Sequence, residues 1–313
     1  MNRHAWILLL VLAALWGSSY LFIKVALEDL SPAMIVFSRT ALAALILLPF
    51  ALATGALAGL RARVGAIAVL ALLQIAAPFM LISVGERYIS SSLTGILVAS
   101  APIFTALFAP FLDDEERSGG LRLVGVALGI VGVAVLLGLD AGDGPLALVG
   151  GLMVVLAGAG YALAGFYFKR RFADVAPVGA VTVAMVAAAA MLAVPAALTA
   201  PAEVPHAITL GAIAALGAGG TGIAFVIFYT LLGTVGPART SLVAYIAPGF
   251  AVIYGVTLLG EQFTLATLAG LALIVGGSWL AAGGRLPLGR SRDVPAGTGA
   301  RISTTKPERT VAP

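Results

Sequence analysis

Two stretches of sequence decide the fold: SSLTGILVASAPIFTALFAPFLDDE at residues 91–115 and PARTSLVAYIAPGFAVIYGVTLLGE at residues 237–261. They align without a gap, and the same residue types recur at aligned positions that include Thr94 and Thr240, Pro102 and Pro248, Phe104 and Phe250, Glu115 and Glu261. Chance can produce any one of these matches, but an ordered set indicates an internal repeat.

The similarity extends over most of the chain. The segment from Trp16 to Lys24 matches the segment from Tyr161 to Lys169, and further pairs follow in order: Pro32 and Pro177, Phe79 and Phe225, Gly125 and Gly270, Gly132 and Gly277. The spacing drifts by a single residue, which one insertion and one deletion explain. We therefore expect two similar halves, 5–140 and 146–283. Residues 284–313 are rich in Gly, Pro and Arg, and we expect them to form a disordered cytoplasmic tail.

The composition excludes several classes of protein. Of the 313 residues, 61% are apolar and only 10% are charged, and the mean hydropathy is +1.09. A soluble domain carries about a quarter charged residues, so a disordered chain, a nucleic-acid binder and an ordinary soluble enzyme are excluded. The chain has no cysteine, which excludes disulfides and thiolate metal sites. The composition predicts an all-α polytopic membrane protein without cofactor or metal.

Ten apolar segments are long enough to cross a bilayer as helices. An odd number of spans in each half inserts the second half upside down, so we expect two inverted five-helix repeats, an architecture of many secondary transporters. The predicted transmembrane helices are 5–25, 32–53, 64–84, 90–112, 121–139, 146–168, 176–199, 207–231, 236–259 and 264–282.

The basic residues predict the orientation. With the N-terminus inside, 15 of the 18 lysines and arginines fall on the inner side and Arg87 alone on the outer side. Lys24 and Arg39 lie within spans or at their ends, and Lys24 is expected to snorkel to the interface. This bias places both termini in the cytoplasm.

The repeated pattern resembles a known family. Trp16-Gly17-Ser18-Ser19 with Lys24, Pro32 with Arg39, and Ser91-Ser92 with Pro102 and Glu115 are similar to the EamA family of the drug/metabolite transporter superfamily. The resemblance covers residues 5–283, and Thr240-Ser241, Pro248, Glu261 and the helix with Gly270 and Gly277 repeat it in the second half. It implies an inner-membrane transporter of ten helices whose relatives export amino acids and other small metabolites.

We therefore expect a secondary transporter in the inner or plasma membrane, an exporter of amino acids or related compounds that works by alternating access. The alternatives are a membrane-embedded enzyme, which is disfavoured because no catalytic set is visible, and a channel, which would need a polar ring. The expected partners are a small-molecule substrate and the lipid bilayer, with no nucleic acid. The sequence is also compatible with a coupling proton or a counter-substrate, and with a homodimer.

Arg39 is the strongest candidate for a site residue. It lies about 12 Å into its span at helical rise, where a charge is costly. It either binds a substrate carboxylate or bonds to carbonyls or to a glutamate such as Glu86. Its repeat partner is Ala184, so the site is asymmetric.

Other polar and aromatic residues complete the predicted site. Trp16 and Tyr161 lie within the membrane, and we expect them in a cavity wall, with Gln74 and Tyr245 near the pathway. Gly95 has the small-residue spacing for close helix packing, and Pro102 and Pro248 are hinge candidates in mid-helix. The Gly-x-Gly-x-x-Gly pattern at 217–222 has no preceding strand, and we interpret it as helix packing rather than a dinucleotide site.

Overall fold

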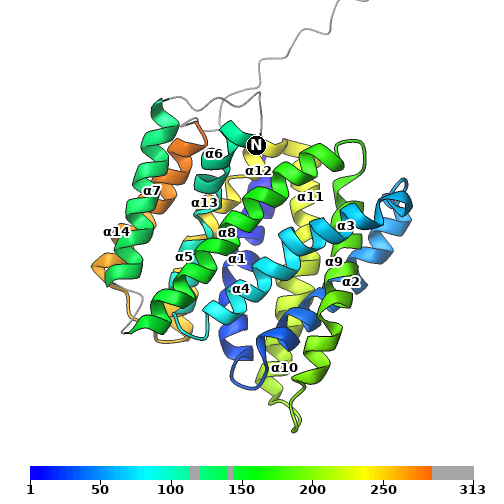
Figure 1. The fold of residues 1–313 in the computed structure, drawn as a ribbon, viewed down its shortest axis with the longest axis horizontal. Coiled ribbons are helices and arrows are strands. Elements are labelled where there is room, and N and C mark those ends of the chain that lie inside the picture. The colour runs from blue at the N-terminus through cyan, green and yellow to red at the C-terminus, as the bar shows by residue number, and fades with distance from the viewer. Residues whose placement is uncertain (113–119, 140–143, 284–313) are drawn as a thin grey trace, which may run out of the picture.

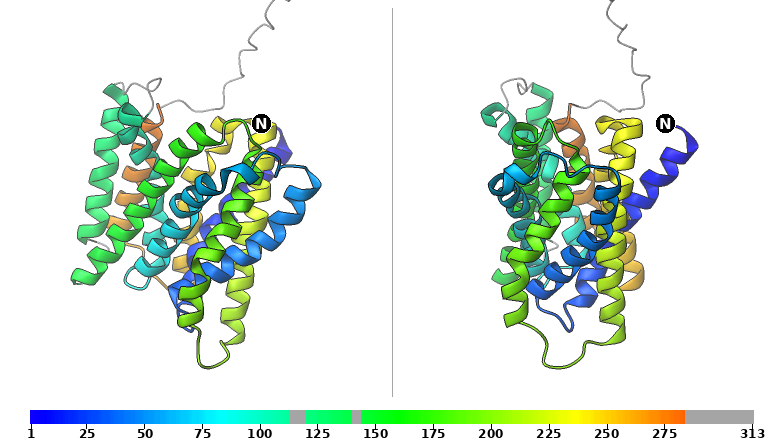
Figure 2. Two further views of the ribbon diagram at one scale, coloured as in Figure 1. Left: turned by 45° about the vertical axis from the view of Figure 1, so that its right-hand side comes forward. Right: turned by 90° about the vertical axis from the view of Figure 1, so that its right-hand side faces the viewer.

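A computed structural model describes residues 1–112, 120–139 and 144–283, and these ranges are entirely without β-strands. The expected tail 284–313 and the acidic run 113–116 lie outside the described residues. The helices form one bundle, shown in Figure 1 and from two further sides in Figure 2. Their bounds are α1 Arg3–Ala26, α2 Pro32–Ala53, η1 Arg61–Arg63, α3 Val64–Ala71, η2 Leu72–Ala76, α4 Ala77–Gly85, α5 Ser91–Val98, α6 Ala101–Leu112, α7 Gly120–Leu139, α8 Pro145–Arg171, α9 Pro177–Leu198, α10 Ala207–Ala214, η3 Ala215–Ile223, α11 Ala224–Val235, α12 Pro237–Thr240, α13 Val243–Leu258 and α14 Leu265–Ala281.

Nine helical runs in the described ranges are long and apolar enough to cross a membrane. The segment expected at 264–282 forms α14, an apolar helix of 17 residues. The all-helical class is therefore confirmed, whereas the count of ten spans stays a prediction.

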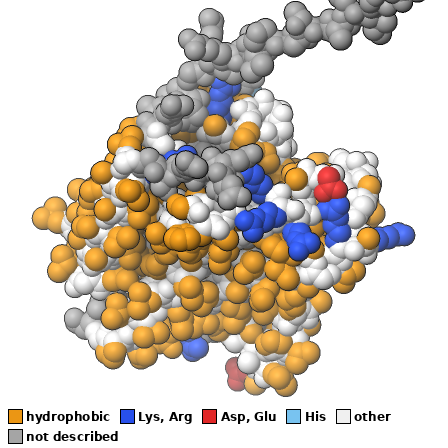
Figure 3. Space-filling view, turned by 45° about the horizontal axis from the view of Figure 1, so that its top comes forward, with side chains coloured by type: hydrophobic (Ala, Val, Ile, Leu, Met, Phe, Trp, Pro, Cys, Tyr) orange, Lys and Arg blue, Asp and Glu red, His pale blue; other side chains and the backbone are white. Residues whose placement is uncertain are grey.

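The sides of the bundle are apolar. Large side chains stand exposed there, among them Leu45 at 69%, Phe111 at 81% and Leu198 at 81%. In water this surface would be strongly unfavourable, whereas lipid tails solvate it. Figure 3 shows the basic side chains gathered on the face that carries the N-terminus. We call this the N-terminal face, and we call the other end of the bundle, where α1 ends and Asp29 and Arg87 lie, the opposite face.

Glycines allow helices of the two halves to pack at short range. A Cβ at Gly17 of α1 would lie 2.5 Å from Cβ of Phe250 and 2.8 Å from the carbonyl oxygen of Ala247, both in α13. A Cβ on Gly132 of α7 would lie 2.9 Å from Cγ1 of Ile274 in α14. Such contacts are those that small-residue spacing produces in membranes.

Several spans are interrupted. The third and eighth contain π-helical segments, η2 and η3. The fourth breaks at Ala99 and Ser100, where Ser278 of α14 donates a hydrogen bond of 2.8 Å to the carbonyl of Ala99. Pro102 therefore lies in the first turn of α6 rather than in mid-helix, a position where its missing N–H removes no helical bond. Pro248 does lie inside its helix, α13, which continues past it.

Candidate functional site

Arg39 of α2 is buried inside the bundle. Ser31 caps α2 by accepting a hydrogen bond of 3.1 Å from the amide of Met34, and Pro32 fills the first helical turn. This start places Arg39 two turns into the helix, where its side chain is 5% exposed. The structure therefore encloses Arg39, and its role as a site residue stays a prediction.

Two side chains hold the guanidinium. Nε and Nη2 of Arg39 both donate to Oγ1 of Thr221, at 3.3 and 3.1 Å. Cζ lies 3.8 Å from the centre of the Phe79 ring, a cation–π contact that is worth about 2 kcal/mol when desolvated. Within the described ranges Nη1 donates to no acceptor and no carboxylate forms an ion pair with Arg39. The sequence predicts backbone carbonyls or Glu86 as alternative partners of Arg39. Among the described residues, none of them accepts a hydrogen bond from its guanidinium.

The glycine pattern of the eighth span positions Thr221. In η3 the Thr221 hydroxyl donates 2.9 Å to the carbonyl of Leu216, five residues earlier, and accepts from Arg39. A Cβ at Gly217 would lie 3.2 Å from Cα of Arg39, and one at Gly220 would lie 2.8 Å from Oγ of Ser19. The pattern therefore serves close packing of η3 against α1 and α2.

Two tyrosines lie close enough to Arg39 to interact with its charge, Tyr20 of α1 and Tyr161 of α8. Arg39 and Tyr161 are thus two predicted site residues that the fold brings together. Tyr20, Phe79 and Thr221 are additions. The repeat flagged Phe79, and the glycine pattern contains Thr221, but neither signal indicated a contact with Arg39.

Trp16 belongs to an adjacent aromatic cluster. Its ring centre lies 6.1 Å from that of Phe225 and 5.4 Å from that of Phe228. Phe225 in turn packs against the apolar cluster that contains Phe79 and Tyr161. Trp16 therefore reaches the surroundings of Arg39 through Phe225.

The remaining predicted residues are not among the contacts of the Arg39 guanidinium in the described part of the chain. Gln74 in η2 and Tyr245 in α13 are half-buried, and neither forms a hydrogen bond or ring contact with Arg39 in the described part of the chain. Gly95 of α5 packs against Ala251 of α13, and its Cβ would lie 3.0 Å from the Tyr20 ring.

A second polar cluster lies at the opposite face. Nζ of Lys24 donates to the carbonyls of Glu86 at 2.7 Å and of Ile89 at 2.9 Å, on either side of Arg87 in the loop between α4 and α5, and the snorkelling of Lys24 stays a prediction. Glu261 accepts from the amide of Ser91 at 2.7 Å, and from the amide and hydroxyl of Ser92 at 2.9 and 2.5 Å. It therefore joins the loop after α13 to the first turn of α5.

Two aspartates fix loops at the two ends of the bundle. At the opposite face, the Thr209 hydroxyl and the His206 backbone and ring donate to Asp29 and lower its pKa to about 2. At the N-terminal face, Arg63 pairs with Asp174 at 2.5 Å and lowers the pKa of that carboxyl. Each pair joins one half of the chain to the other.

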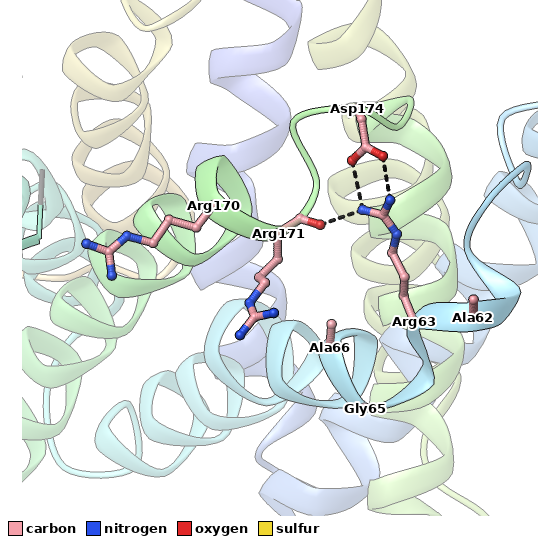
Figure 4. A pocket seen from close by; sticks show the side chains of 7 residues that line it. All are labelled: Ala62, Arg63, Gly65, Ala66, Arg170, Arg171 and Asp174. Carbon is pink, nitrogen blue, oxygen red and sulfur yellow. Dashed lines mark hydrogen bonds and ion pairs between the residues drawn. The ribbon is translucent and has the colours of Figure 1, made fainter.

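The Arg63–Asp174 pair borders a surface hollow of about 540 Å³, shown in Figure 4. Arg170 and Arg171 also line it, and Arg63 donates to the carbonyl of Arg171 at 2.6 Å. The hollow lies at the rim of the bundle, and its lining does not include Arg39. It is a corner where η1 meets the end of α8, separate from the buried cation.

An apolar-sided bundle of long helices that encloses a buried cation is the architecture of a polytopic membrane protein. The model of the EamA-like transporter family matches residues 4–138 and matches again at 148–283. The chain belongs to this family, which confirms the resemblance seen in the sequence.

Relatives of the chain are named as transporters. The inner membrane transporter YedA of Escherichia coli (strain K12) is 30% identical over 275 residues, which is 85% of each chain. The transporter YdfC of Bacillus subtilis (strain 168) is 27% identical and covers 85% of this chain and 87% of its own. A crystal structure of another protein superposes with a TM-score of 0.62 over 90% of this chain and 97% of its own at 22% identity, a likeness of fold alone. The protein is therefore an integral membrane protein with a transporter role.

Proposed function

We propose that the chain is a secondary transporter that exports small metabolites, amino acids or related compounds, across the inner or plasma membrane. The observation that carries this proposal is the buried Arg39, whose Nη1 has no acceptor among the described residues. A substrate carboxylate would supply one and would repay the cost of the buried cation. Tyr161, Trp16 and the rings around them would contact the apolar part of the substrate, and Gln74 and Tyr245 would lie along its path.

We further propose that transport proceeds by alternating access between the halves 5–140 and 146–283. Contacts between these halves come in exchangeable pairs, which supports two repeats related by a two-fold axis. α1 of the first half packs on α13 of the second, and α8 of the second packs on α5 and α6 of the first. Exchanging the halves converts one pair into the other, whereas the pairs of α2 with α9 and of α7 with α14 map onto themselves.

Variants of Arg39 test the site. Arg39→Lys keeps the charge but loses the planar fork, so uptake of carboxylate substrates into vesicles should fall while the amount of detergent-stable protein is unchanged. Arg39→Gln should reduce uptake further. The control is Arg87→Gln at an exposed arginine, which should transport normally. Normal transport per folded molecule in Arg39→Gln would contradict the proposed site.

Comparison of metabolites in cells with and without the protein identifies the substrate. A carrier redistributes a compound unchanged, whereas a membrane-embedded enzyme would produce a new compound. Because every metabolite is followed at once, this readout separates the two classes of protein and names the compound that moves.

We also propose ten spans with both termini in the cytoplasm. The basic side chains on the N-terminal face support this orientation (Figure 3). A reporter fused after Arg292 should be cytoplasmic, and one inserted between Asp140 and Asp143 should be on the other side of the membrane. The same location for both reporters would refute the ten-span topology.

A further inference from the structure

Glu86 is a buried carboxylate without a hydrogen-bond donor. It follows the last residue of α4 and is 0% exposed. Lys24 reaches its backbone carbonyl at 2.7 Å, but neither carboxylate oxygen of Glu86 has a hydrogen-bond partner in the described part of the chain. A structural glutamate at this face is held differently, as the three donors to Glu261 demonstrate.

Other unsatisfied polar atoms lie in the same stretch. The hydroxyls of Ser83 and Ser91 are buried and have no partner within the described ranges. Ser83 precedes Glu86 by three residues and therefore lies on the same side of α4. Because buried polar atoms are normally satisfied, two unsatisfied carboxylate oxygens with an unsatisfied hydroxyl one helical turn before them indicate a site that exchanges a partner.

Two basic groups and one further acid surround Glu86, but none of them forms an ion pair with it in the described residues. Lys24 of α1, Arg39 of α2 and Glu261 after α13 interact with it electrostatically, and Tyr20 of α1 also faces it. No ion pair within 4.0 Å joins Glu86 to any of them in the described residues. From α8, Gly150 and Val154 pack against the preceding Gly85, and neither carries a charge.

These surroundings link the charge of Glu86 to the arrangement of the helices. An isolated carboxylate in a low-dielectric interior is strongly unfavourable, and such a group binds a proton instead. Water, or an approach of Lys24 or Arg39, would stabilise the ionised form. Opening the bundle at the opposite face would admit water to this position, because Glu86 directly follows α4 at that face.

We propose that Glu86 is the proton-binding site that couples transport to a proton gradient. When the opposite face is open, a carboxylate oxygen of Glu86 takes a proton from water there. The face closes on the neutral carboxyl, and the proton leaves to water when the N-terminal face opens. No covalent bond to the substrate forms and no electron moves. This inference rests on the proposed alternating access, but its tests require no substrate.

Infrared spectroscopy tests the protonation. The carbonyl stretch of a protonated carboxyl is recorded on the purified full chain in detergent from about pH 5 to about pH 9, around the neutral range of cells. We expect a band that disappears on raising the pH and is absent in Glu86→Gln. The control is Glu203→Gln, an exposed acid, which should keep the band. In Glu86→Asp the band should persist at a shifted frequency, which keeps the test valid if Glu86→Gln does not fold.

Thiol labelling tests the coupling. The chain has no cysteine, so Ser83→Cys, which removes no hydrogen bond, reports access to the interior. Labelling by a membrane-impermeant maleimide is normalised at each pH to Tyr88→Cys, an exposed position in the loop that follows α4. We expect normalised labelling of Ser83→Cys to rise with pH in the otherwise unchanged protein and to be independent of pH with Glu86→Gln.

Either of two results overturns the proposal. One is a carboxyl band that is absent or does not change over the whole pH range, which would make Glu86 permanently ionised or permanently neutral. The other is pH-dependent labelling that survives Glu86→Gln. A failure of vesicle uptake would count against the transport function and would leave both readouts interpretable.

Discussion

The bond between Glu261 and the first turn of α5 is expected to hold the opposite face closed. Glu261 belongs to the second half and Ser91 and Ser92 belong to the first, so a movement of one half against the other must break this link. We predict that Glu261→Gln shifts the protein toward a form open at that face.

The magnitude follows from the three hydrogen bonds. Each bond to a charged group is worth about 1.5–3 kcal/mol, and a charge at a helix N-terminus adds about 0.3–1 kcal/mol. A glutamine keeps one acceptor oxygen but turns its amide group toward a backbone N–H, so one or more bonds and the charge are lost. Since Glu261 is only partly buried, we expect a net loss of about 2 kcal/mol, or roughly 30-fold in the opening equilibrium.

Labelling of Ser83→Cys measures this shift. The rate of modification from the opposite side should rise roughly 30-fold with Glu261→Gln, in proportion to the open population. Gly255→Ala should act in the same direction, because its Cβ would meet the Glu261 carboxylate and the Ser92 hydroxyl. Glu203→Gln serves as control and should leave labelling unchanged. Equal labelling in Glu261→Gln and in the control would refute a closing role for this link.

Two further predictions concern stability. The pKa of Asp29 is lowered to about 2 from an ordinary 3.8. The contribution of the ionised Asp29 to stability is therefore complete above about pH 4 and is lost as the pH falls toward 2. The melting temperature of Asp29→Asn should depend less on pH in this window, and an unchanged dependence would argue against the Thr209 and His206 bonds. Gly17→Ala should destabilise the protein by about 1–3 kcal/mol because its Cβ would overlap α13. The control is Gly249→Ala, whose Cβ would meet nothing within 4 Å and which should be neutral or slightly stabilising. Equal melting temperatures for the two variants would contradict the close packing of α1 on α13.

The sequence by itself determined the class of the protein. Apolar runs of about 20 residues have one stable form in a bilayer, because the backbone must satisfy its own hydrogen bonds there. The helices therefore follow directly from composition and length. The repeat and the glycine-rich packing pattern could also be predicted, because both depend only on the order of residues along the chain.

The sequence also identified Arg39 as unusual, because a charge deep in an apolar run is costly wherever its side chain points. It did not identify the partners. Thr221 lies 182 residues away and reaches the guanidinium only through the π-helical register of η3, which depends on packing against α1 and α2.

The tertiary structure alone decided the role of the groups at span ends. Lys24, Glu86 and Glu261 all read as interfacial from their positions in the sequence. In the fold, Lys24 donates to two carbonyls of the loop after α4, and Glu261 caps a helix of the other half. Glu86 is enclosed, and its carboxylate has no donor among the described residues. Depth along one helix is a property of the sequence, whereas enclosure by neighbouring helices depends on how the two halves pack, and this packing is what isolates the Glu86 carboxyl from water.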